Sequence, residues 1–186
     1  MRVDKRLISR CVKQERKAQK ALYQLLLPYL TGVCKRYLRN PSDLHDALQD
    51  SFVNVFRAVE TYDESKAEFH TWATRITINC TLKLNQRLYK VETNELIEES
   101  ALISHIPCVL DQLNDEDLLA YLKRMPASFL EVFNLHLVDG YSHKEIADML
   151  DIHESLSRQR LSRAKKWVKE RMTEQGEEIE RIENRI

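Results

Sequence analysis

Turn-forming residues are scarce in this chain, which has only three glycines and four prolines among its 186 residues. A β-sandwich or a collagen-like sequence needs many more of them, so their scarcity favours a mostly helical chain. Hydrophobic residues make up 43% of the chain and charged residues 31%, a balance that supports a packed core and excludes wholesale disorder. We therefore predict an all-α fold.

The sequence also bears on where the protein works. No stretch approaches the roughly 20 apolar residues that cross a membrane, and the charged N-terminus lacks the apolar segment of a signal peptide. The four cysteines, Cys11, Cys34, Cys80 and Cys108, are far apart and form no close metal-ligand pair. We expect a cytoplasmic protein whose thiols are reduced.

Charge is strongly segregated along the chain, although the formal net charge is zero. Residues 1–40 contain eleven basic and two acidic side chains, residues 91–118 contain eight acids and no Lys or Arg, and residues 151–172 are again basic. Such blocks indicate a chain that meets polyanions at two places and carries an acidic segment between them.

The apolar periodicity divides the chain into two helical domains, residues 7–90 and 116–172, joined by an acidic linker at residues 91–115. In the first domain we expect a helix that begins near Lys13 and that Pro28 kinks or divides. Two further helices are expected at residues 44–59 and 69–84. Residues 173–186 form a short amphipathic tail, which either extends the preceding helix or docks on a helical module or partner.

A helix-turn-helix is predicted near the C-terminal end. Ser142 and Glu145 have the spacing of a capping box, and the tight connection 151–153 leads into a longer helix at about 154–172. One face of that helix carries side chains that can reach base edges or phosphates: Arg158, Gln159, Ser162, Arg163, Lys165, Lys166 and Lys169. The alternative interpretation is a solvated basic face.

These motifs together resemble those of bacterial RNA polymerase sigma factors of the extracytoplasmic-function group. Residues 125–133, 139–147 and 160–165 follow the pattern of that family's DNA-binding end. Residues 46–52 resemble its polymerase-binding helix, and residues 69–79 resemble its promoter-melting helix. The resemblance covers about residues 10–90 and 116–172.

The resemblance implies a non-enzymatic protein that binds core RNA polymerase, at the clamp helices of β′ and the flap of β, and directs it to promoter DNA. For contact with the polymerase it implicates Asp46, Gln49, Asp50 and Phe52, the last being equally well placed for the core. For the single-stranded −10 element it implicates Asp63, Lys66, Phe69, Arg75, Asn79 and Lys83. For the −35 element it implicates Ser155, Arg158, Gln159, Ser162, Arg163 and Lys166.

Two positions depart from the family pattern. Asp151 stands where a turn glycine is usual, and Asp can adopt the left-handed conformation that such a turn needs. Ser157 stands where a β-branched apolar residue is usual, which predicts a recognition helix that rotates slightly or packs less firmly.

The acidic linker either threads the polymerase cleft or is a solvated connector. Trp72 either stacks on a base or, as its phase favours, packs in the core. No cofactor, metal or small-molecule substrate is expected, whereas the resemblance implies an inhibitory anti-sigma partner. The rival function is a helix-turn-helix regulator or adaptor that does not replace sigma.

Overall fold

The computed structural model describes residues 3–88, 122 and 124–183, with side chains to residue 170. The chain divides into two units at Val91/Glu92. The described residues form helices and turns and contain no strand, which confirms the all-α prediction. Among these residues, no helix combines the length and hydrophobicity that a membrane crossing requires. The acidic linker, residues 91–115, lies outside the described residues.

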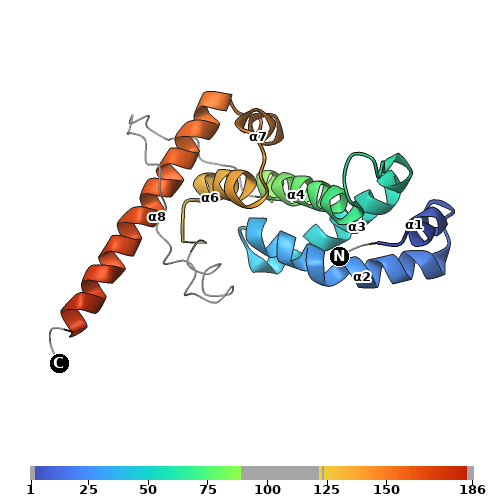
Figure 1. Cartoon of the computed structure of the whole chain (residues 1–186), viewed down its shortest axis with the longest axis horizontal. Helices are drawn as coiled ribbons and strands as arrows, with labels where there is room; N and C mark the ends of the chain where they lie inside the picture. Colours follow the sequence, from blue (N-terminus) through green and yellow to red (C-terminus); the bar gives the residue numbers. More distant parts are fainter. Residues whose placement is uncertain (1–2, 89–121, 123, 184–186) are drawn as a thin grey trace. The chain divides into compact units, whose positions relative to one another are not determined.

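The first unit packs three long helices around one apolar core (Figure 1). These are α2 (Arg16–Tyr37), α3 (Leu44–Ala58) and α4 (Phe69–Leu88), and the shorter α1 (Lys5–Val12) packs against α2. Leu22, Leu26 and Leu30 recur every four residues on α2 and are fully buried. Val55 of α3 and Ala73 of α4 complete the centre of this core.

The beginning of the first unit differs from the sequence prediction. A separate helix, α1, precedes the expected start near Lys13, and Asp4 caps it by accepting a hydrogen bond from the Arg6 amide at 3.0 Å. Gln14 has a φ of 58°, which breaks the helix before α2 begins. Pro28 does not divide α2, because its ring is exposed and the buried leucines hold the helix on either side.

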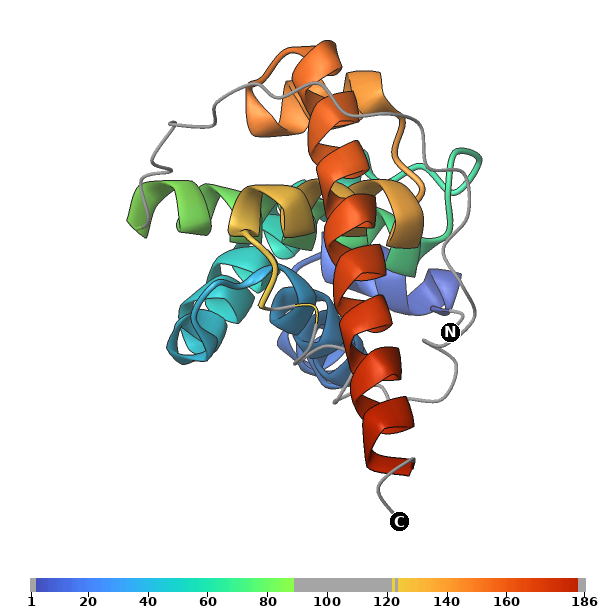
Figure 2. The ribbon, with the colours of Figure 1, turned by 90° about the vertical axis from the view of Figure 1, so that its left-hand side faces the viewer.

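The second unit contains α6 (Ala127–Phe133), the π-helical turn η4 (Asn134–Val138), α7 (His143–Leu150) and α8 (Glu154–Glu183). Helix α6 crosses the first half of α8, as the view in Figure 2 shows, and α7 packs against the start of α8. Phe133, Ala164 and Val168 form the core between α6 and α8, with Leu122 and Met125 beside them. Helix α8 continues through Gly176 without a break, so the tail forms no separate helix up to Glu183.

Both expected features of the helix-turn-helix connection are confirmed. Ser142 accepts a hydrogen bond from the Glu145 amide, and the Glu145 carboxylate accepts one from the Ser142 amide at 3.0 Å, completing the capping box. Asp151 ends α7 in the left-handed conformation, with φ 54° and ψ 52°. These two local features fix the beginning of α7 and the direction in which α8 leaves it.

The cap yields a stability prediction. Ser142→Ala should lower the free energy of unfolding of the second unit by about 1 kcal/mol, because the first turn of α7 loses its side-chain acceptor. Chemical denaturation followed by circular dichroism measures this change. Lys144→Ala, at an exposed position of the same helix, is the matched control and should stay within about 0.5 kcal/mol of wild type. Equal losses in both variants would contradict a capping role.

Candidate functional site

The polar face of α8 presents most of the residues predicted to read the −35 element. Ser155, Arg158 and Gln159 are exposed in the first turns, and Lys166 is exposed two turns later. Arg158 forms an ion pair with Glu154, and Lys166 lies 3.8 Å from the Glu170 carboxylate. Because these acids are on the same helix, they hold the two cations in extended positions without burying them.

Two members of that predicted set are less accessible. Ser162 and Arg163 are both half-buried. The Arg163 guanidinium lies 6.0 Å from the centroid of the Phe129 ring, at the distance of a cation–π contact. Arg163 therefore contributes to the contact between α6 and α8 as well as to the polar face.

Ser157 is fully buried under this face, and its hydroxyl has a partner. Its Oγ lies 2.9 Å from Nδ1 of His143 at the start of α7. The His143 ring in turn stacks on His136, with centroids 4.5 Å apart and planes 14° apart. Sequence patterns do not reveal this cluster, because its members are separated along the chain and meet only in the folded unit.

The electrostatic surroundings of His143 disfavour its protonation. Burial lowers the pKa of the imidazole below its ordinary value, and the neighbouring His136 and Arg158 lower it further, while Glu154 acts in the opposite direction. The folded chain thus holds His143 neutral at a pH where the unfolded chain would protonate it.

The loop before α4 is organised by its own polar groups. Asp63 accepts hydrogen bonds from the Ser65 hydroxyl at 2.7 Å and the Ser65 amide at 2.9 Å, and these bonds lower the pKa of the Asp63 carboxyl. Lys66 lies 3.7 Å from the same carboxylate. The Tyr62 hydroxyl donates to the Ala67 carbonyl at 3.0 Å, which closes the loop from below.

Phe69 must be corrected as a candidate DNA-contacting residue. Its side chain is only 3% exposed and packs edge-on against Tyr62, with ring centroids 4.9 Å apart. Trp72 is half-buried beside both rings, as its helical phase favoured. Phe69 begins α4 inside the core and anchors the loop, a structural role in place of the exposed contact expected from the sequence.

The remaining −10 candidates lie along α4. Arg75 and Lys83 are exposed and Asn79 is half-buried, and their spacing of four residues places them on one side of the helix.

A contact between α1 and the loop before α4 was not predicted from the sequence. Lys5 of α1 donates to Glu64 at 2.8 Å and ties the N-terminal helix to the loop.

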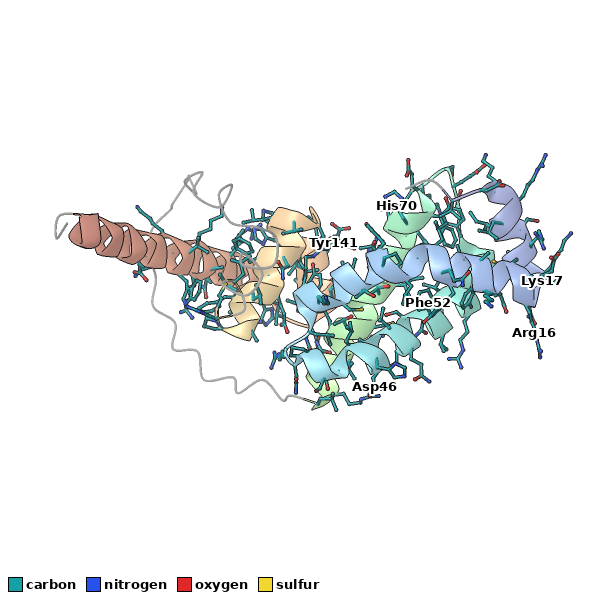
Figure 3. The ribbon with its side chains drawn as sticks, turned by 90° about the horizontal axis from the view of Figure 1, so that it is seen from below. Arg16, Lys17, Asp46, Phe52, His70 and Tyr141 are labelled. Carbon is teal, nitrogen blue, oxygen red and sulfur yellow. The ribbon has the colours of Figure 1, made fainter. Side chains whose placement is uncertain are left out.

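The polymerase candidates lie around a shallow groove on α3. Asp46, Gln49 and Asp50 are exposed, whereas Phe52 is 5% exposed and belongs to the core. In Figure 3 the Phe52 ring lies between α2 and α3, and Asp46 lies on the outer side of α3. Phe52 lines the groove from within the core, which agrees with the core alternative given for it from the sequence.

Two apolar residues of this groove were missed from the sequence. Tyr23 and Val53 are each 40% exposed, and the Tyr23 ring lies 4.4 Å from that of Phe52. Tyr23 comes from α2, twenty or more residues away from the acidic positions, and only the packing of α2 on α3 brings it to the groove. Helical periodicity alone does not predict that the Tyr23 ring stays exposed.

His143 gives a prediction for pH dependence. Its folded-state pKa lies below the unfolded value of about 6.5, so the unfolded chain binds more protons between these two values. The free energy of unfolding of the second unit should therefore fall as pH drops from 7.5 to 5.5. In denaturation curves His143→Gln should lose less stability over this range than wild type. An equal or larger loss in the variant would contradict the assignment.

Comparison with known proteins finds matches to both units of the chain. The sequence pattern of sigma-70 region 2 matches residues 22–87, and that of sigma-70 region 4 matches residues 115–168. The chain is 24% identical over 182 residues to the ECF RNA polymerase sigma-E factor of Haemophilus influenzae, covering 91% of this chain and 95% of that protein.

Two solved structures share the fold. One is the sigma factor RpoE in complex with the anti-sigma factor NepR from Bartonella quintana, with a TM-score of 0.52, 19% identity, and coverage of 83% of this chain and 96% of that one. The other is CnrH in complex with the cytosolic domain of CnrY, with a TM-score of 0.50, 18% identity, and coverage of 90% and 95%.

The two matched regions together span most of the chain, and their order is the order in which the two units were predicted from the residues. This result favours sigma activity over a regulator that does not replace sigma. The chain therefore belongs to the sigma-70 family and is a sigma factor of the extracytoplasmic-function group, which binds core RNA polymerase, directs it to promoters and assists DNA melting.

Proposed function

We propose that the groove on α3 is where this sigma factor binds core polymerase. The observation that carries this assignment is an exposed apolar patch, Tyr23 and Val53, beside the exposed polar side chains of Asp46, Gln49 and Asp50. An apolar centre with a polar rim is the usual anatomy of a protein interface. The partner surface would be the clamp helices of β′, with the second unit on the flap of β.

Single-stranded −10 DNA is assigned to the loop 62–68 and to α4. The hydrogen bonds from Ser65 to Asp63 and the Lys66–Asp63 ion pair give the loop a defined shape, which supports capture of an extruded base. Arg75, Asn79 and Lys83 then offer two cations and an amide along one side of α4, a set suited to tracking a phosphate backbone.

The −35 duplex is assigned to α8. Ser155, Arg158 and Gln159 near its N-terminal end are exposed and carry the groups that hydrogen-bond base edges, and Lys166 lies where it would neutralise a phosphate. This arrangement corresponds to the docking of a helix-turn-helix, whose recognition helix enters the major groove.

An anti-sigma protein is a further proposed partner. Two structures with this fold were solved as complexes, one with an anti-sigma factor and one with the cytosolic domain of CnrY. The apolar groove on α3 would be covered by such a partner in the inhibited state. The work of this sigma factor is assigned to the cytoplasm, where polymerase and promoters are found.

Promoter-specific transcription by purified core polymerase tests the function as a whole. Adding the chain should produce transcripts from its own promoters, and core polymerase alone should not. A regulator would instead alter transcription by a holoenzyme that already contains another sigma factor. If adding the chain to core polymerase yields no start-site-specific transcript, the proposed function is contradicted.

Arg158 and Lys166 should behave differently on duplex DNA. Arg158→Ala should reduce discrimination between the correct −35 element and a scrambled one by about 1–3 kcal/mol, because a base contact is lost. Lys166→Ala should weaken binding to both sequences alike and reduce the slope of log affinity against log salt by about 1. Competition binding of the holoenzyme measures both. A uniform loss in Arg158→Ala would contradict base recognition.

Arg75 and Asn79 should act in strand opening and not in polymerase binding. Alanine at either position should leave association with core polymerase intact while weakening open-complex formation, because the single strand loses a contact that offsets unstacking. Permanganate footprinting on a linear promoter measures the melted thymines. Asp46→Ala combined with Asp50→Ala is the reciprocal control, which should reduce polymerase association first. Unchanged thymine reactivity in the α4 variants would remove this assignment.

A further inference from the structure

We propose that His143 is a positioning residue for the recognition helix, and that its contact with Ser157 sets the orientation in which α8 presents its base-reading side chains. The proposal rests on the proposed function of α8 at the −35 element. His143 lies in α7, on a different helix from those side chains, and the family resemblance assigns it no role.

A continuous series of contacts links four segments of the second unit. Nδ1 of His136 in η4 lies 2.8 Å from the Tyr141 carbonyl, just before α7. The His136 and His143 rings stack at 4.5 Å, and Nδ1 of His143 lies 2.9 Å from Oγ of Ser157 in α8. The ring of His143 is thus held on one side by an aromatic neighbour and on the other by the helix it positions.

Ser157 stands directly before Arg158 and Gln159 in α8, so any rotation of the helix at Ser157 moves both exposed side chains. An apolar residue at this buried position could slide against α7, whereas a hydrogen bond is directional and specifies both the rotation and the height of the helix. Ser157 therefore provides a contact with α7 that fixes the orientation of α8 more closely than an apolar residue would at this position.

The protonation states of the cluster are consistent with this role. A carbonyl only accepts hydrogen bonds, so Nδ1 of His136 carries a proton and donates to Tyr141. The hydroxyl of Ser157 can donate to or accept from a neutral His143. The charged and titratable groups that face His143 are His136 from η4 and Glu154, Arg158 and Lys165 from α8, and only Glu154 favours its cationic form.

The test uses the full chain bound to core polymerase at pH 7.5. Its readout is the ratio of affinities for a promoter with the correct −35 element and one with that element scrambled. His143→Ala and Ser157→Ala should each reduce this ratio about tenfold, and the double variant should lose little more than either alone. His143→Gln, which keeps a hydrogen-bonding side chain without titrating, should retain most of the ratio. His153→Gln, at an exposed histidine between α7 and α8, is the matched control and should equal wild type.

Circular dichroism and affinity for core polymerase separate positioning from folding. The proposal requires a reduced ratio in variants that remain fully helical and bind core polymerase normally. A ratio that falls only in step with the unfolded fraction would overturn it, as would losses that simply add in the double variant. If wild type itself does not discriminate the −35 sequences, the proposed function of α8 fails. If wild type discriminates and the folded variants match it, the positioning role alone fails.

Discussion

The burial of the α2 leucines against α3 and α4 is the interaction on which both surfaces of the first unit depend. Leu22, Leu26 and Leu30 are fully buried, and each such side chain contributes about 1.5–3 kcal/mol to folding. Tyr23 directly follows Leu22 and lies beside the stripe that these leucines form, where it reaches the groove on α3. The same packing orients α4 so that Arg75 and Lys83 remain exposed.

Much of this architecture follows from the sequence, because helical periodicity is a local property. The bounds expected for α3 and the beginning of α4 agree with the structure within one residue, and the capping box of α7 is present as its spacing required. Helix α1 was missed although Leu7, Ile8, Cys11 and Val12 are spaced as one apolar side, because the helix is only eight residues long. The break after it depends on the left-handed conformation of Gln14, which composition does not predict.

The candidate site was harder to predict, for a different physical reason. Phe52 and Phe69 were candidates for contact by their place in a motif, but Tyr23 of α2 and Tyr62 of the loop also pack against their rings. Tyr23 was missed because it belongs to a different helix and reaches the groove only where α2 packs on α3. Ser157 looked like a weakness in the core because its partner lies fourteen residues earlier in the chain. Tertiary contacts of this kind are invisible to a periodicity argument.

The unbroken course of α8 has a mechanical consequence. At 1.5 Å per residue its 30 residues form a rod about 45 Å long, with the base-reading positions near one end. A partner bound at the C-terminal end of α8 would change the orientation of the base-reading end through the continuous helix backbone. Gly176 lies between them, and glycine weakens a helix interior by about 1 kcal/mol relative to alanine. A force applied beyond Gly176 would therefore tend to bend the helix at this residue before it rotates the base-reading positions.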